Sequence, residues 1–437
     1  MKRIELKALK AVSPGSHLQI LLQKFMLTSG LFFKNELLNH AAAAAFFFIL
    51  SVIPVFFLII FSFDRYLTSF PEVSEVFFSF LKELNHNLDK DLFVRVGLLN
   101  VKATAIGVFG LINLIWAGCW ILSSIQMGLA VVFPAKKRKH LAMNVFSVAI
   151  LIFLLFISFL ATLVSVGLNL FNKFLESEII ILVFMQYLLP YANRILPVAV
   201  VFLIIFMAYR YVPAQQPDSR SSLVGALWCS LAIILMHNLF SRFADVTRFN
   251  VIYGVLGSLI FTFLLMQLTF VLFFFFAEYT YVSEKIDILL LEKMFFYKFN
   301  RDVKGRRVEK LLFKSPRYIF EKYARTYRAG EVLFKEGDRV EEIYYVERGR
   351  IGIFRRHGDS ETRIADIQQG EVFGEMAYLL EENRTATAIA DTDAVLLIIT
   401  PELFEELISR KGFSRDVIRS LSERIRKTNL FLQTGEK

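Results

Sequence analysis

The sequence predicts two parts of different class: an α-helical membrane domain with six transmembrane helices, and after it a small β-roll with flanking helices. The first observation is composition, since 55% of the 437 residues are hydrophobic and 47 of them are Phe, whereas soluble domains have about 45–50% apolar residues. The second is charge, because residues 301–437 carry 26 basic and 24 acidic residues, against 24 and 16 in residues 1–300. The third is a series of short, glycine-bounded apolar runs that begins after residue 326.

Uncharged stretches long enough to cross a bilayer recur in the first part, where a spanning helix needs about 20 apolar residues. Five are continuous: Leu37 to Phe63, Ala103 to Ala135, Leu141 to Asn172, Ser221 to Ser241 and Phe249 to Ala277. A further stretch, 179–209, is divided by Arg194 and contains Pro190 and Pro197. We interpret it as a short interfacial or broken piece followed by one span. The predicted membrane domain covers residues 1–283 and has six spans.

Basic residues beside these stretches predict the orientation. If the N-terminus is cytoplasmic, the cytoplasmic edges receive Lys2, Arg3, Lys7, Lys10, Lys24, Lys34, the run Lys136 to Lys139, Arg210 and Arg220. The short outer loops receive only Lys173, Arg242 and Arg248. Because cytoplasmic loops are enriched in Lys and Arg, we expect a multi-pass protein of the inner membrane with both termini cytoplasmic. The excess of basic over acidic residues is then explained by the orientation of the chain in the membrane, and we expect no nucleic-acid partner.

The last third divides into a linker and the β-roll. Residues 284–326 are polar and basic and predict a helical linker, and residues 327–437 form the second domain. Strands are expected at about 331–335, 343–346, 351–354, 362–367 and 394–399, with turns at Gly330, Gly337, Gly349, Gly358 and Gly370. Thr400-Pro401 predicts the start of a helix. A second helix is expected at about 413–432.

One segment between two predicted strands, 373–387, carries the most informative chemistry. It contains Gly374 and Glu375, and Arg384 follows nine residues after the glutamate. A short helix here would direct backbone N–H groups at an anion, and the Arg384 guanidinium can pair with a phosphate. A buried Glu375 carboxylate can accept a hydrogen bond from a ribose hydroxyl. On spacing alone, the alternative is a surface ion pair between Glu375 and Arg384 on an ordinary turn.

Residues from about 306 to 432 resemble a cyclic nucleotide-binding domain. The resemblance rests on the runs Arg328 to Asp338, Tyr344 to Gly349, and Phe373 to Thr387, of which the last is similar to the family's phosphate-binding cassette. It implies cAMP or cGMP as a regulatory ligand, with Arg384 on the cyclic phosphate, Glu375 on the ribose 2′-hydroxyl and the 413–432 helix as a lid. The implied ligand-binding residues are Gly374, Glu375, Met376, Ala377, Arg384 and Thr385.

This cassette departs from the family pattern in two ways. Asn383 stands where proline is common, and Glu381 and Glu382 add negative charge close to the predicted phosphate. Thr385 occurs in binders of either nucleotide and does not choose between cAMP and cGMP.

Residues from about 25 to 285 resemble the YihY/BrkB family, whose members were formerly labelled ribonuclease BN-like. The run Ala41 to Pro54 is similar to the family's first-span signature, and Tyr209 to Pro213 to the motif after the fourth span. Asn250 to Ser258 and Ala277-Glu278 resemble the motifs that open and close the sixth. The resemblance implies six spans and a role in transport or lipid handling.

No arrangement typical of an enzyme is visible in the sequence. The six histidines (17, 40, 86, 140, 237 and 357) are scattered singly, and Cys119 and Cys229 lack metal-site spacing. We therefore expect no enzyme activity, ribonuclease included, and no metal. Polar residues inside the spans are candidates either for a transport pathway or for helix–helix hydrogen bonds: Asn113, Gln126, Gln186, Arg194, His237, Asn238, Gln267 and Glu278.

The expected function is transport or lipid handling in the membrane, modulated by a cyclic nucleotide that binds the cytoplasmic domain. The expected partners are membrane lipids and the nucleotide, and a homo-oligomer is possible. The alternatives are a membrane-anchored, nucleotide-responsive scaffold for a protein partner and, disfavoured by the lack of a catalytic arrangement, a membrane enzyme such as a ribonuclease.

Overall fold

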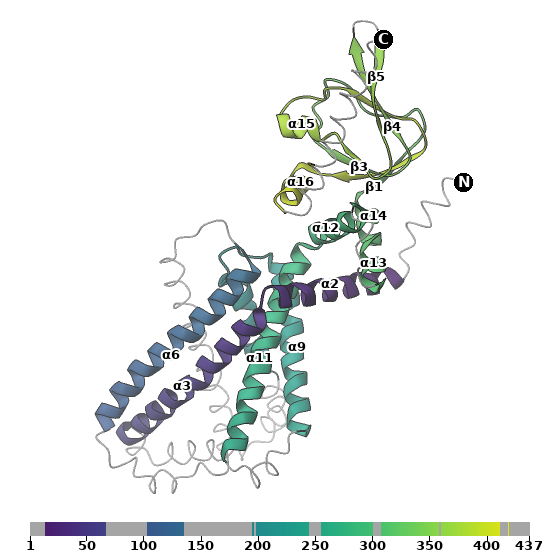
Figure 1. Ribbon diagram of the computed structural model, residues 1–437. Coiled ribbons are helices and arrows are strands. Elements are labelled where there is room, and N and C mark those ends of the chain that lie inside the picture. Colours follow the sequence, from purple (N-terminus) through teal and green to yellow (C-terminus); the bar gives the residue numbers. More distant parts are fainter. Residues whose placement is uncertain are drawn as a thin grey trace, which may run out of the picture. The chain divides into compact units, whose positions relative to one another are not determined.

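The computed structural model describes residues 14–66, 103–134, 195, 198–243, 255–299, 307–357, 360–410 and 418 (Figure 1). The chain forms two compact units. One unit comprises residues 28–284, and the other comprises residues 1–27 together with 285–437. The division falls inside helix α2 (Pro14–Lys34) and directly after helix α11 (Val255–Glu284).

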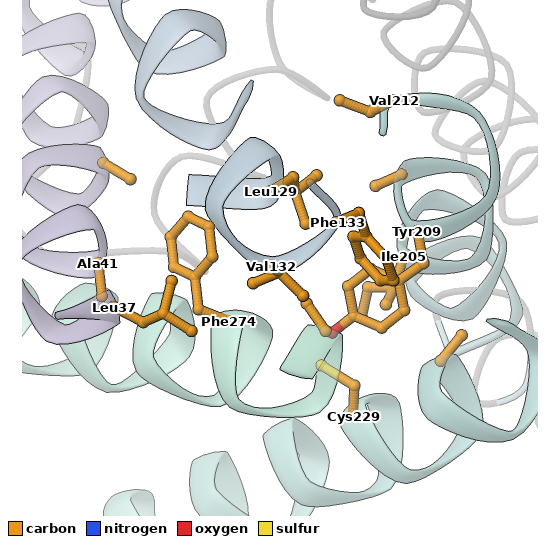
Figure 2. Packing of buried hydrophobic residues seen from close by; sticks show 14 of the residues in the cluster. Leu37, Ala41, Leu129, Val132, Phe133, Ile205, Tyr209, Val212, Cys229 and Phe274 are labelled. Carbon is orange, nitrogen blue, oxygen red and sulfur yellow. The ribbon is translucent and has the colours of Figure 1, made fainter. Parts of the chain in front are cut away.

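The unit of residues 28–284 is helical, and α11 is its central element. This helix packs against α3 (Leu37–Tyr66), α6 (Ala103–Val132) and α9 (Ser219–Phe243), and α3 also packs along α6. Figure 2 shows the shared core, in which Phe274 of α11 lies between side chains of the neighbouring helices. A Cβ atom at Gly128 would lie 2.3 Å from the Phe274 ring. Glycine on α6 therefore makes room for this ring, as small residues do at helix contacts in membrane domains.

Two described helical segments are long and apolar enough to cross a membrane, Ser219–Phe240 and Ile260–Glu284, and three shorter apolar helices cover Leu37–Ser51, Trp116–Val132 and Val198–Tyr211. Large apolar side chains are exposed on these helices, among them Trp116, Trp120, Leu227, Trp228, Leu231 and Leu235. Helices thus occupy four of the predicted spans and part of the divided one. The predicted span at 141–172 lies outside the described residues, so the number six stays a prediction.

Where it is described, the segment 284–326 contains three helices and ends in a strand that begins at residue 324, and the prediction of a polar linker is wrong for its first helix. The segment contains α12 (Ile286–Phe299), α13 (Arg307–Phe313) and α14 (Arg317–Tyr323). In α12 the buried side chains are Ile286, Ile288, Leu289, Leu290, Leu291, Met294, Phe295 and Tyr297. The Phe295 ring meets Tyr345 of the sheet edge-to-face, with centroids 5.0 Å apart. Helix α12 is therefore part of the core of its unit.

The predicted β-roll is confirmed as two four-stranded antiparallel sheets (Figure 1). One sheet has the order β1 (Ala324–Tyr327), β8 (Ala394–Ile399), β3 (Ile343–Arg348), β6 (Val372–Phe373). The other has the order β2 (Val332–Phe334), β7 (Thr387–Ala390), β4 (Ile351–His357), β5 (Ser360–Ile367). Because β1 pairs with β8, the roll begins at Ala324, three residues before the predicted boundary.

Most of the turns predicted in the roll, and the helix predicted to start at Thr400-Pro401, are present in the structure. Gly330, Gly337, Gly349 and Gly370 have positive φ between 82° and 98°, and Gly358 lies outside the described residues. Helix α16 (Pro401–Ile408) follows the N-cap residue Thr400 and has proline at its start. The predicted lid helix at 413–432 lies outside the described residues, apart from Ile418.

Candidate functional site

The candidate site lies where β6 ends and the short helix α15 (Glu375–Leu380) begins. Gly374 joins the two elements with φ +80°. A Cβ atom there would lie 2.9 Å from Nη1 of Arg384 and 3.2 Å from the carbonyl oxygen of Glu342. Both the left-handed backbone and the lack of space require glycine at this position.

The Arg384 side chain is drawn into the roll and is only 3% exposed. Its Nη1 donates to the Gly374 carbonyl at 2.6 Å, and its Nη2 donates to the Glu342 carbonyl at 2.5 Å. The guanidinium lies 4.0 Å from the centroid of the Phe334 ring, and Nε has no hydrogen-bond partner. Backbone bonds fix the residue, since Arg384 N donates to the Asp338 carbonyl and Gly337 N donates to the Arg384 carbonyl.

Electrostatically, this buried cation lacks a bonded counter-charge. No ion pair joins Arg384 to a carboxylate within the described ranges. Burial lowers the pKa of its guanidinium, and the charges of Tyr344, Glu342 and Glu375 oppose that effect. Because burying a charge is costly unless the charge is paired, the site favours an anion. Arginine's N–H groups match the oxygens of a phosphate.

The other predicted ligand residues divide into buried and exposed ones. Glu375 is 1% exposed at the start of α15 and Ala377 is 4% exposed, whereas the Met376 side chain is 45% exposed. Thr385 is exposed in the loop before β7. The structure thus brings Gly374 and Arg384 into contact and places Glu375 within electrostatic range of that arginine. Since both Glu375 and Arg384 are buried, the surface ion pair on an ordinary turn is wrong.

The aromatic side chains of Phe334 and Tyr344, which pack against the Arg384 guanidinium, were not identified from the sequence. The Tyr344 and Phe373 rings stack with centroids 5.2 Å apart, and Phe334 lies beside both. The Tyr344 hydroxyl donates to a Glu342 carboxylate oxygen at 3.0 Å. Inward-facing positions of the strands at 332–334 and 343–346 could have indicated these rings. Only the pairing of strands places Phe334 and Tyr344 next to Arg384, which lies 50 and 40 residues later in the sequence.

In the helical unit, Glu278 of α11 is the polar span residue with the most unusual surroundings. It is fully buried, and one carboxylate oxygen accepts a hydrogen bond from Asn35 Nδ2 at 3.2 Å. Its other oxygen, Oε1, has no hydrogen-bond partner, and Gln126 and Gln267 each have one buried polar atom without a hydrogen bond as well.

Of the other polar residues predicted inside the spans, His237 is exposed, and Gln186 and Arg194 lie outside the described residues. Within the described ranges no group of His, Cys, Asp and Glu has metal-binding geometry.

Comparison with known proteins identifies both parts of the chain. Residues 324–411 match the family model described as cyclic nucleotide-binding domain, and residues 30–288 match that described as virulence factor BrkB. The cyclic AMP receptor protein of Thermus thermophilus is 36% identical over 110 residues, which cover 25% of this chain and 51% of that protein. Human cGMP-dependent protein kinase 2 is 29% identical over 94 residues, which cover 22% and 12%. The chain thus spans about half or less of the length of these curated relatives.

A solved structure, that of the Thermus thermophilus catabolite activator protein, is 28% identical and covers 31% of this chain and 62% of its own, with a TM-score of 0.26. The BrkB match covers more than half of the chain, and the resemblance noted in the sequence is confirmed over both segments. The chain therefore belongs to the BrkB family of membrane proteins and carries a cyclic nucleotide-binding domain in its last third.

Proposed function

We propose that the roll binds cAMP or cGMP and that this binding regulates the membrane domain. The observation that carries the proposal is Arg384, a buried cation that hydrogen-bonds to two backbone carbonyls, lies over the Phe334 ring and has no ion pair with a carboxylate among the described residues. A cyclic phosphate supplies the missing negative charge, and the Glu375 carboxylate accepts a hydrogen bond from the ribose 2′-hydroxyl. The family match at 324–411 and the similarity to proteins named for cAMP and cGMP support this choice of ligand.

For the membrane domain we propose transport of a solute or movement of a lipid. The domain crosses the inner membrane six times and keeps both termini cytoplasmic, where the nucleotide is available. Glu278 supports a pathway, because an ionisable side chain in a membrane domain is costly and tends to face a pathway or a partner. The protein acts as a regulated transporter, not as an enzyme.

Regulation passes through α12. One residue, Lys285, separates the end of α11 from the start of α12. Helix α12 is fastened to the nucleotide-binding domain by the Phe295–Tyr345 contact and by the ion pair between Glu292 and Arg410, 2.7 Å apart. Lys285 itself pairs with Glu406 of α16 at 3.1 Å. A rearrangement of α16 or β3 on ligand binding therefore moves the segment that leads directly into α11.

Ligand binding is tested by titration calorimetry of the full chain in lipid nanodiscs with cAMP and with cGMP. The full chain is required, because a soluble fragment that begins within α12 would lose part of the core. Binding of at least one nucleotide is expected. Absence of heat with both nucleotides, at concentrations that saturate a known cAMP-binding protein, would refute the sensor.

Transport is tested in proteoliposomes by following solute flux and lipid scrambling with and without the bound nucleotide. The ligand can shift the membrane domain only by its differential affinity for two conformations. Nucleotide-dependent movement of a solute or lipid is expected. Binding without any such movement would favour the alternative, in which the membrane domain anchors a nucleotide-responsive surface for a protein partner.

Replacing Glu278 with glutamine is expected to reduce flux at least about tenfold, the effect of about 1.4 kcal/mol. Glutamine has the same shape and keeps an oxygen for Asn35, but it cannot carry the charge that a pathway uses. The control is Glu284→Gln on the same helix, where the carboxylate accepts a hydrogen bond from the backbone N–H of Asp218 at 3.1 Å. Equal flux in both variants, at unchanged melting temperature, would show that Glu278 has only a packing role.

A further inference from the structure

The first half of α2 turns its apolar side chains outward and its polar ones inward. Leu18, Leu21, Leu22 and Phe25 are 61%, 49%, 47% and 58% exposed. Their spacing of three and four residues places them on one face of the helix. On the opposite side Gln23 is 1% exposed, and its Nε2 donates to the Leu312 carbonyl of α13 at 2.7 Å.

This pattern is inverted with respect to a helix on a water-soluble domain, where the apolar stripe faces the core. Lys24 is also partly buried, and burial lowers the pKa of its ammonium group while the charge of Asp287 opposes that effect. Next to the acceptor of Gln23, Leu311 of α13 is 79% exposed. The outer face of α2 is therefore built for a medium other than water.

Charge and connectivity identify that medium. The sequence of residues 1–34 contains six basic residues and one acidic residue, and four of the basic ones precede Pro14, outside the described residues. Helix α2 continues past Leu27 into the unit that carries the BrkB match. A basic segment with one apolar helical face suits the boundary between anionic head groups and acyl chains. We propose that the face formed by Leu18, Leu21, Leu22 and Phe25 lies in the interfacial layer of the bilayer and binds anionic lipid there.

The consequence concerns the nucleotide-binding domain. The Gln23–Leu312 hydrogen bond joins this half of α2 to the helices on which the roll is built. The domain is then attached to the membrane at a second place besides the α11–α12 connection. The proposed attachment depends on the membership of the BrkB family and not on the proposed transport, so a result that disproves transport would not disprove the attachment.

The test uses the full chain with Phe25→Trp, reconstituted in vesicles of phosphatidylcholine with and without phosphatidylglycerol. Lipids brominated on their acyl chains near the head group are expected to quench about half of the added emission, because interfacial helices insert about 5–10 Å into this layer. Subtracting the emission of the unaltered chain removes Trp116, Trp120 and Trp228. Quenching is expected to increase when phosphatidylglycerol is present.

The matched control is Ile364→Trp on β5, which replaces a side chain that is 48% exposed on the roll. It is expected to be quenched by aqueous acrylamide and not by brominated lipid. Equal behaviour of the two variants would overturn the proposal. So would protection of Phe25→Trp from both quenchers in a cross-linkable dimer, since the face would then be covered by a second copy of the chain.

Discussion

Replacing Arg384 with alanine is expected to weaken binding of cAMP and cGMP by about 100-fold or more. Removing one member of a buried, charge-assisted pair costs about 2–5 kcal/mol, and about 2.7 kcal/mol corresponds to 100-fold. Among the described residues of this domain, no second cation is bonded to Gly374 to take over the phosphate. The measurement is titration calorimetry on the full chain in nanodiscs.

Two further variants separate the contact from folding. Arg384→Lys keeps the charge but loses the planar fork, so an intermediate loss of affinity is expected. Arg363→Ala removes an arginine on β5 that pairs with Asp366 and Asp391 and is expected to leave affinity unchanged. If Arg384→Ala binds either nucleotide as well as the unaltered chain, the phosphate contact is wrong. Comparing the melting temperatures of the variants shows whether the roll remains folded.

Much of the roll could be predicted because its signals are local. Turn glycines, the Thr400-Pro401 helix start and the Gly374–Arg384 cassette are each read within a few residues. The hydrogen bond from Arg384 Nη2 to the Glu342 carbonyl could not be predicted, because the two residues are 42 positions apart in the sequence. Strand β1 was also missed, since it is a strand only by pairing with β8.

The composition of α12 and α2 did not show which of their side chains are buried. The sequence predicted a polar, basic linker at 284–326, a range that includes Asp287 and Lys298 of α12. The structure pairs them with Lys322 and Glu347 at the edge of a buried apolar surface. In α2 the apolar residues face outward. The spacing of apolar residues in a sequence can indicate an apolar face of a helix. Whether that face is buried depends on the elements that pack against the helix.

Replacing Phe295 with alanine is expected to lower the free energy of opening α12 by about 3–5 kcal/mol, the usual cost of removing a buried phenyl ring. Phe295 is 1% exposed and meets Tyr345 at 5.0 Å. Its neighbour Phe296 is 39% exposed, so Phe296→Ala is the matched control, and its effect is expected to be small. Hydrogen exchange of the α12 amides in the full chain measures both changes.

The same pair of variants tests whether α12 carries the regulatory signal. If the helix transmits movement as a docked element, Phe295→Ala uncouples the membrane domain: nucleotide still binds at Arg384, but flux no longer responds to it. Phe296→Ala is expected to retain the response. An unchanged nucleotide response in Phe295→Ala, together with the loss of amide protection, would exclude α12 docking as the coupling route. The next route to test would then be α2, the other segment through which the chain passes between the two units.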